Sequence, residues 1–351
     1  MRPFIMALGL GKLSLATGGG LCGRCALTSF QRCQTQLWMS SGSPGKRKRP
    51  RGAEDPTRGE AGFHTYYRDI YGERWPALSK ALAMPTQQVA RMNKFAASQD
   101  VTEHLGQGVD RIALDHLFDG AAPTCFSISR GQEVDEAGSN KKLPPSPVDE
   151  ATGLTSYYLM DLASVVTAAA LGVQPGDVVA DFCAAPGGKT LILAEGLRPE
   201  AGGRLVSNDS SRKRRERLKR VVREYVPQEV LSHVKVTGFD ASRWFFYEKG
   251  VYDRILVDAP CSSERHLLEE GHQEYLRDWS RQRSKRNAAT QRSILSSALQ
   301  AAKEGGLVLF STCSINPKEN DGVVAQMLRR GSAEVTLRAT AQLHCLMTPL
   351  F

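Results

Sequence analysis

The sequence predicts an α/β protein. We expect a Rossmann-like domain, with a mostly parallel sheet and helices on both faces, preceded by an N-terminal, mainly helical extension. From Thr155 onward, short apolar runs alternate with helical patterns across short connections, which is typical of a parallel sheet. One apolar run ends at the glycine-rich string DFCAAPGGKT, Asp181–Thr190, and two others end at VDAPCSS, Val257–Ser263, and FSTCS, Phe310–Ser314. Because ligands gather outside the carboxyl ends of such strands, we expect two thiols and a glycine-rich loop to converge on one cleft.

The first 53 residues differ in charge from the rest of the chain. Residues 1–53 contain nine Lys and Arg and no Asp or Glu, out of 46 basic and 37 acidic residues in all. The remainder therefore carries 37 of each and is neutral, so the net charge of +9 belongs to the N-terminal segment. A neutral body predicts only modest intrinsic affinity for nucleic acid.

The composition of residues 1–53 is typical of a mitochondrial transit peptide, because basic residues are spread among Leu, Ala, Ser and Gly without acids. We predict a transit peptide or disordered segment here, and localisation in the mitochondrial matrix. Two alternatives stay open. The string KRKRPR, Lys46–Arg51, resembles a nuclear signal, or the whole run is a solvated charged segment.

Hydropathy and cysteine usage narrow the class of protein. No run of about 18 apolar residues is present, so we expect no transmembrane helix and no membrane partner. Eight cysteines in 351 residues without a secretory signal indicate a reducing compartment rather than a disulfide framework. Cys22 and Cys25 form a CxxC pair, but no second pair follows at zinc-site spacing, so no metal site is expected.

Residues 54–150 are predicted to form the helical extension and a linker. Aromatic and apolar residues recur at helical spacing from near His64. The string PTCFSIS, Pro123–Ser129, has the pattern of a strand. The segment Gly131–Glu150 is polar and proline-rich, which is typical of a linker or surface loop.

Residues 151–330 are predicted to form the Rossmann-like domain. Its expected helices are Tyr157–Leu171, the strongly basic Ser210–Tyr225, Gln291–Lys303 and Pro317–Leu328. Its expected strands are Val178–Phe182, Arg204–Ser207, Val234–Thr237, Arg254–Val257 and Leu307–Phe310. Residues 331–351 are atypical, with one strand expected around Glu334–Leu337, so we expect the fifth strand to lie near an exposed edge.

The glycine-rich string does not match the common nucleotide-binding motifs. Cys183 stands five residues before Gly188, where a P-loop requires glycine, and no G-x-G-x-x-G string is present. ATP and NAD are therefore disfavoured, whereas a tight strand-to-helix turn near a small nucleoside is expected. Asp209 and Asp240 close the next two strands, and a carboxylate after the second strand is placed to accept hydrogen bonds from ribose hydroxyls. The alternative for each is a capping Asp.

Three strings together resemble the RNA cytosine-5 methyltransferases of the Sun/Nop class: DFCAAPGGKT, VDAPCSS and STCSINPKEN. The resemblance runs from about Phe63 to Leu328. Further strings such as LGVQPGD and CSSERHLLEE make it strongest to the mitochondrial ribosomal-RNA branch of the class. It implies that S-adenosylmethionine is the methyl donor, that RNA is the substrate and that 5-methylcytosine is the product.

The chemistry explains why cysteines are needed. Carbon 5 of cytosine is a poor nucleophile, and addition of a thiolate to carbon 6 creates an enamine that accepts the methyl group. The resemblance implies that Cys313 is the nucleophile, that Cys261 assists product release and that Asp258 hydrogen-bonds the base. DNA enzymes carry the nucleophile in the Pro-Cys string instead, so the cysteine after the fifth strand favours RNA. The alternative is that both cysteines are small buried hydrophobic residues.

The resemblance also implies which residues contact the cofactor. Lys189 of the glycine-rich loop would supply positive charge, with a solvated lysine at a helix start as the alternative. Arg214 is the one candidate from the basic helix, whose other charges are expected to face solvent or touch phosphates. Cys183 is expected to pack rather than react. The full set of expected cofactor-binding residues is Ala184, Ala185, Pro186, Gly187, Gly188, Lys189, Asp209, Arg214, Asp240 and Asp258.

The expected partners are mitochondrial ribosomal RNA and an RNA-binding protein of the mitochondrial transcription-termination-factor type, in support of mitoribosome assembly. Three alternatives stay open. One is a mitochondrial tRNA cytosine-5 methyltransferase. The second is a catalytically weak scaffold with a methyltransferase fold, which the atypical residues 331–351 favour. The third is a P-loop ATPase, which Cys183 disfavours.

Overall fold

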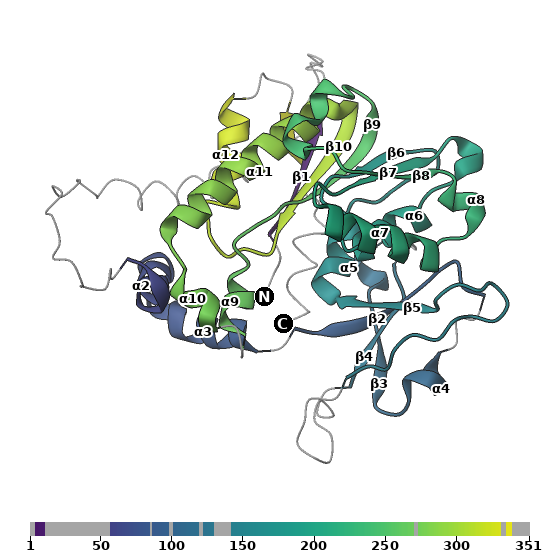
Figure 1. The fold of residues 1–351 in the computed structure, drawn as a ribbon, viewed down its shortest axis with the longest axis horizontal. Helices are drawn as coiled ribbons and strands as arrows, with labels where there is room; N and C mark the ends of the chain where they lie inside the picture. Colours follow the sequence, from purple (N-terminus) through teal and green to yellow (C-terminus); the bar gives the residue numbers. More distant parts are fainter. Residues whose placement is uncertain are drawn as a thin grey trace, which may run out of the picture.

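A computed structural model describes residues 4–10, 57–84, 86–97, 101–118, 122–129, 142–269, 273–330 and 335–338. Its main sheet has seven strands in the order β11-β1-β10-β9-β6-β7-β8 (Figure 1). The bounds of these strands are β1 Phe4–Leu10, β6 Val178–Asp181, β7 Arg204–Asn208, β8 Val234–Thr237, β9 Tyr252–Asp258, β10 Ala302–Thr312 and β11 Val335–Arg338. The five strands from β10 to β8 are parallel, which confirms the predicted Rossmann-like sheet.

The parallel strands are apolar because both of their faces are buried. In β10, Val308 and Phe310 pack on one side of the sheet and Leu309 packs on the other. In β9, Val257 and Leu256 divide in the same way. Successive side chains of a strand point to opposite faces, so a continuous apolar run fits a strand covered on both sides.

Helices cover the two faces of the main sheet. On one face lie α11 and α12 with the 3₁₀ segment η4, and on the other lie α6 and α7 (Figure 1). The bounds of the helices of this domain are α5 Leu162–Ala169, α6 Gly188–Glu195, α7 Arg212–Tyr225, α8 Gln228–Leu231, η4 Ala241–Phe246, α9 Glu264–Leu268, α10 Gln273–Arg277, α11 Arg281–Ala301 and α12 Asp321–Arg330. The predicted basic helix is α7, and the predicted helix at Gln291–Lys303 is the C-terminal half of the longer α11.

A second sheet of four antiparallel strands, in the order β3-β4-β2-β5, was not predicted. Its strands are β2 Gln88–Met92, β3 Val109–Ile112, β4 Cys125–Ile128 and β5 Tyr157–Asp161. The predicted helix Tyr157–Leu171 is therefore wrong for its first five residues, because β5 pairs with β2 over that length. Arg91 of β2 forms an ion pair with Glu195 of α6, and both side chains are almost completely buried. This pair ties the second sheet to the main domain.

The N-terminal extension begins with the predicted helices. They are α2 Gly59–Tyr71 and α3 Trp75–Ala83, followed after β2 by the short α4 Thr102–Leu105. Phe63, Tyr67 and Trp75 form an aromatic cluster with Trp279, the residue that precedes α11 by two positions. The extension thus packs directly against the segment that leads into α11.

Strand β10 is not at the edge of the main sheet, which corrects the expectation of an exposed fifth strand. β1 pairs antiparallel with β10, from Phe4 opposite Thr312 to Gly9 opposite Leu307. β11 then pairs antiparallel with β1. The single strand expected around Glu334–Leu337 is β11, so two segments from opposite ends of the chain complete this side of the sheet.

Some sequence features lie outside the described residues: Cys22, Cys25, Cys33, Lys46–Arg51 and Cys345. Within the described part of the chain, no helix combines the length and apolar character needed to cross a membrane.

Candidate active site

The two cysteine strings leave the main sheet side by side. Strands β9 and β10 are parallel neighbours, with Asp258 opposite Ser311 at their carboxyl ends. Cys261 follows β9 by three residues and Cys313 follows β10 directly. Their Sγ atoms lie 2.7 Å apart, both thiols are free, and the Cys313 side chain is exposed. The predicted convergence of the two thiols is therefore present in the structure.

The environment makes the two thiols unequal. The hydrogen bond from Cys261 is the main cause that lowers the pKa of Cys313. Partial removal of the thiol from water opposes this change. The hydroxyl of Ser263, whose Oγ lies 2.9 Å from the Cys313 sulfur, lowers the pKa of Cys313 further. The same bond to Cys313, together with burial, raises the pKa of Cys261. The lowered pKa favours the thiolate, the nucleophilic form, at Cys313, and the raised pKa favours the protonated thiol at Cys261.

Lys189 is not a solvated lysine at a helix start. Its Nζ lies 2.8 Å from Oδ2 of Asp258 and donates a hydrogen bond to Ser164 at 3.0 Å. Burial alone would lower the pKa of Lys189, but the carboxylates of Asp258 and Asp181 and the thiolate of Cys313 raise it overall. Asp258 also accepts a hydrogen bond from Ser311 at 2.8 Å. A fixed positive charge and a fixed carboxylate thus stand beside the thiols.

The glycine-rich loop runs from the end of β6 to the start of α6. Gly187 has φ +122°, and a Cβ there would meet Val221 of α7 at 2.9 Å, so only glycine fits this turn. Arg214 of α7 donates a hydrogen bond to the carbonyl of Ala185 at 2.6 Å and lies 3.3 Å from Asp209. The loop residues 184–189, Asp209 and Arg214 are therefore brought together.

Three carboxylates stand at the carboxyl ends of adjacent strands of the sheet: Asp181 is the last residue of β6, Asp258 is the last residue of β9, and Asp209 directly follows β7. Burial is the main cause that raises the pKa of Cys183, and the negative charges of these three carboxylates raise it further. Burial also raises the pKa of Asp181 to about 7. Asp258 and Asp209 are paired with Lys189 and Arg214. The carboxylate oxygens at these strand ends suit a ligand with hydroxyl or ammonium donors, so the residues present fit S-adenosylmethionine. Cys183 itself packs against the core, as expected.

Asp240 shares no hydrogen bond or ion pair with the described residues of this group. It lies after β8, where it caps η4 by accepting hydrogen bonds from the Ser242 amide at 2.9 Å and the Ser242 hydroxyl at 2.7 Å. Its side chain is 60% exposed, whereas that of Asp209 is 4% exposed. The structure thus shows the capping alternative for Asp240 and a buried carboxylate for Asp209.

Comparisons with known proteins agree with this geometry. The model of the 16S rRNA methyltransferase RsmB/F family matches residues 168–345. The 5-cytosine rRNA methyltransferase NSUN4 of Bos taurus is 36% identical over 288 residues, a match that spans 75% of this chain and 71% of the relative. The chain belongs to the RsmB/F family. The resemblance to Sun/Nop-class RNA cytosine-5 methyltransferases is confirmed, and the protein is an RNA cytosine-5 methyltransferase by family.

Two further comparisons extend this result. The mitochondrial tRNA (cytosine(34)-C(5))-methyltransferase of Danio rerio is 31% identical over 274 residues, spanning 76% of this chain and 71% of the relative. Among solved structures, NSun6 from Pyrococcus horikoshii with SFG has a TM-score of 0.56 at 20% identity, covering 76% of this chain and 86% of that one. At that identity the likeness concerns the fold of the RsmB/F domain alone.

Two buried glutamates in this RsmB/F chain were missed by sequence reasoning. Glu264 accepts hydrogen bonds from Ser262 in the Cys261 loop and from the hydroxyl of Ser314 and the amide of Ile315 in the Cys313 loop, the last two at 3.2 and 3.0 Å. It is 0% exposed. Glu264 therefore fastens the two cysteine loops to each other.

Glu319 holds the same loops from the side of α11. It accepts hydrogen bonds from the Ser262 amide at 2.9 Å and from Gln291 of α11 at 3.1 Å, and Gln291 also donates to the carbonyl of Pro260 at 2.9 Å. The only available signal was position: Glu264 follows Cys261 by three residues and Glu319 follows Cys313 by six. Among the described residues no cluster of three or more His, Cys, Asp or Glu has the arrangement of a metal site.

Proposed function

We propose that this protein forms 5-methylcytosine in mitochondrial ribosomal RNA through a covalent adduct of Cys313, with S-adenosylmethionine as the methyl donor. The observation that carries the proposal is the pair of sulfur atoms 2.7 Å apart, beside the Lys189–Asp258 ion pair. A lone cysteine is most often a small hydrophobic residue. Two free thiols in contact at the carboxyl ends of adjacent parallel strands are typical of a reactive site instead.

The cofactor is supported by membership in a methyltransferase family and by the carboxylates at the carboxyl ends of β6, β7 and β9. When bound, S-adenosylmethionine supplies an electrophilic methyl group on a sulfonium. Asp209 would accept hydrogen bonds from ribose hydroxyls, and the loop residues 184–188 would lie against the cofactor. Arg214 holds both of these elements, since it contacts Ala185 and Asp209. Its role would be to position the loop.

The proposed reaction begins at Cys313. The thiolate adds to carbon 6 of cytosine, forming an S–C6 bond and moving an electron pair toward carbon 5. Carbon 5 would then form its bond to the methyl group as the methyl–sulfonium bond breaks and S-adenosylhomocysteine leaves. Carbon 5 next loses its proton to water, the electron pair of that C–H bond restores the C5–C6 double bond, and the S–C6 bond breaks to return the thiolate. Cys261 would assist this last phase, because its sulfur contacts that of Cys313 and its raised pKa favours the protonated form.

Lys189 and Asp258 would set the charge around the base. The ammonium of Lys189 lies close enough to Cys313 for the two to influence each other's protonation, and it favours the thiolate. Asp258 would hydrogen-bond the amino or ring-nitrogen edge of cytosine as the adduct forms. Its bonds to Lys189 and Ser311 fix its orientation before substrate arrives.

Ribosomal RNA is supported by the names of the more similar relatives, at 36% identity, and the tRNA alternative by the 31% identical mitochondrial enzyme. The latter name and the acid-free residues 1–53 support a mitochondrial location. We extend the proposal to mitoribosome assembly and to a partner protein of the transcription-termination-factor type, since the neutral body of the chain predicts modest RNA affinity.

The location is tested by imaging cells. The fluorescence of a fluorescent protein fused after Phe351 should coincide with mitochondria. Nuclear fluorescence that is lost when Lys46–Arg51 is neutralised would contradict this.

The substrate is tested by bisulfite sequencing of mitochondrial RNAs from cells with and without the protein. Loss of a protected cytosine in ribosomal RNA supports the proposal, whereas loss only in a tRNA would move the activity to that substrate. The chemistry is tested on denaturing gels with labelled RNA. Cys261→Ala should leave a retarded protein–RNA band, which Cys313→Ala and the double variant should lack.

A retarded band in Cys313→Ala and none in Cys261→Ala would reverse the roles of the two thiols. No methyl transfer by the wild type, with its partner protein supplied, would favour the scaffold alternative.

A further inference from the structure

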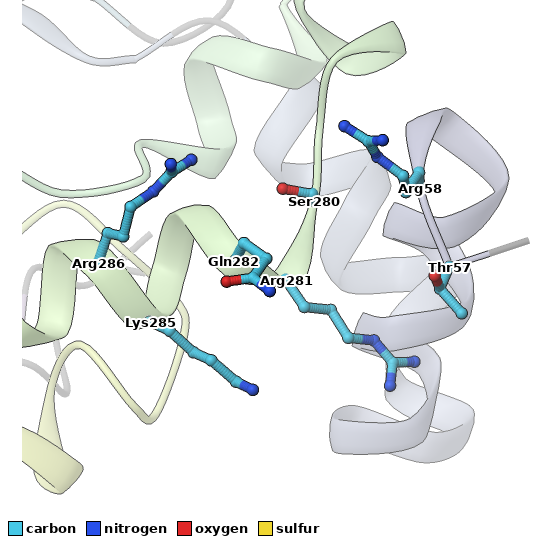
Figure 2. A pocket seen from close by; sticks show the side chains of 7 residues that line it. All are labelled: Thr57, Arg58, Ser280, Arg281, Gln282, Lys285 and Arg286. Carbon is cyan, nitrogen blue, oxygen red and sulfur yellow. The ribbon is translucent and has the colours of Figure 1, made fainter. Parts of the chain in front are cut away.

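A basic groove lies between the start of α2 and the start of α11. It encloses a cavity of about 510 Å³. Four of its seven lining residues are cationic and none is acidic: Arg58, Arg281, Lys285 and Arg286. Thr57, Ser280 and Gln282 complete the lining. Figure 2 shows Arg58 and Arg281 extending from opposite sides of this space. We call this set the basic groove.

Among the residues that the structure describes, few acidic side chains compensate the charge of the basic groove. Lys285 and Arg286 are exposed and make no ion pair with any described residue. Arg281 has one acidic neighbour, Asp69 of α2, at 3.8 Å. The first turn of α11 adds the positive end of a 21-residue helix. Because the body of the protein is neutral as a whole, this local excess of positive charge is a feature that the composition hides.

The basic groove is connected to the cysteine loops through one tyrosine. The guanidinium of Arg281 lies 5.0 Å from the ring centre of Tyr66, and the ammonium of Lys318 lies 5.6 Å from the same ring. Lys318 follows Cys313 by five residues and is exposed. Tyr66 also donates a hydrogen bond to Asn316 at 3.3 Å. The cations of the groove therefore continue toward Cys313.

The spacing of residues along α11 gives the distance between the basic groove and the Cys261 loop. Gln291 bonds the Cys261 loop at Pro260. Arg286 and Arg281 precede Gln291 by five and ten residues, or about 7–15 Å along the helix axis. This distance corresponds to roughly two to four nucleotides at about 3.4 Å per nucleotide of one strand. A strand whose target cytosine is at Cys313 would thus bring neighbouring phosphates to the groove.

We infer that the basic groove binds the phosphate backbone of the RNA strand a few nucleotides from the target cytosine, with Lys318 contacting the phosphates in between. The inference rests on the proposed function for the identity of the polyanion. Lys and Arg contacts to phosphates position a nucleic acid without reading its sequence. The groove would therefore govern RNA affinity and registration rather than the chemical step.

The test uses the full chain and a fluorescein-labelled 12-nucleotide single-stranded RNA, with anisotropy titrations from 50 to 250 mM NaCl. The variant Lys285→Gln/Arg286→Gln removes two charges from the groove. The control Lys235→Gln/Lys249→Gln removes two exposed charges from β8 and from the turn between η4 and β9. Each lost phosphate contact lowers the salt slope by about 0.7, so the groove variant should lose about 1.4 and bind about 25-fold more weakly near 0.1 M salt.

The control should bind as the wild type does, and Arg58→Gln, on the opposite wall, should lose about half as much slope as the groove variant. In methyl transfer, the groove variants should raise KM for RNA and leave kcat near that of the wild type. Equal slopes for the groove variant and the control would overturn the inference. So would displacement of the RNA by millimolar inorganic phosphate, because the site would then take free phosphate. Since binding is measured without methyl transfer, an inactive wild type that still shows the groove effect would contradict the proposed function alone.

Discussion

Tyr67 and Glu264, 197 residues apart in the chain, share a buried hydrogen bond that joins helix α2 to both cysteine loops. The tyrosine hydroxyl donates to the same carboxylate oxygen that accepts from Ser262 and Ser314. The N-terminal extension is thereby part of the support of the two cysteine loops. It also carries one wall of the basic groove.

Glu264→Gln should weaken this support. An amide replaces one acceptor oxygen by a donor that faces other donors, so we expect a loss of about 1–3 kcal/mol in the free energy of unfolding. Formation of the protein–RNA adduct should slow as well, because the two loops are no longer held in register. Urea unfolding and adduct kinetics measure both effects, with the exposed Glu274→Gln as the control. An unchanged adduct rate in Glu264→Gln would show that the carboxylate is not needed to hold the thiols.

Alkylation of Cys313 should report its lowered pKa. The thiolate fraction rises as pH rises through the pKa, so a lowered pKa places the midpoint of iodoacetamide reactivity below that of an ordinary thiol. Cys261→Ala removes the main hydrogen bond that lowers the pKa, so the midpoint should move upward and the rate at pH 7 should fall. Cys261→Ser keeps a donor and should shift less. The rate is followed by mass spectrometry of the peptide that contains Cys313, and a downward shift in Cys261→Ala would contradict the assignment.

Asp209→Ala should weaken the binding of S-adenosylmethionine. Loss of charge-assisted hydrogen bonds worth about 1.5–3 kcal/mol predicts a fall in affinity of roughly ten-fold or more, measured by calorimetric titration. Asp240→Ala is the matched control, and its exposed side chain predicts a smaller effect. If a folded Asp209→Ala variant keeps full affinity, the role of Asp209 is structural: it accepts from the Ser211 amide at 2.9 Å and pairs with Arg214 at 3.3 Å.

Asp181 should make stability fall as pH rises. Its pKa of about 7 lies above the ordinary 3.8, so the folded state retains a proton that the unfolded state releases between about pH 4 and 7. The retained proton contributes up to about 4 kcal/mol to the free energy of unfolding. This contribution is fully present below pH 4 and is lost as pH rises through 7. Asp181→Asn keeps an acceptor for Thr190 and should remove this dependence. Urea unfolding should therefore show that the free energy of unfolding of Asp181→Asn, relative to that of the wild type, is higher at pH 8 than at pH 5. An equal difference between variant and wild type at both pH values would contradict the raised pKa.

The sequence predicted the parts of the fold that depend on local patterns. Apolar runs located the five parallel strands, and their shared edge brought Cys261 and Cys313 together as expected. The assignment of Tyr157–Asp161 to a helix failed because its pairing with β2, some seventy residues earlier, outweighs the local pattern. The Glu264 and Glu319 contacts and the basic groove join residues far apart in the chain, so no spacing rule indicated them. Asp240 looked like Asp209 in sequence, and only burial distinguishes the two.

Strand β1 lies within the segment that we propose as an import signal. Residues 4–9 pair with β10, the strand that Cys313 directly follows. A protease that removes residues 1–53 would remove β1 as well, which would leave β11 without its neighbour and β10 with unpaired backbone groups. The main sheet would then contain β1 in the precursor but not in the mature protein. The mature one would present an open strand edge next to its nucleophile, ready to be closed by another segment of polypeptide.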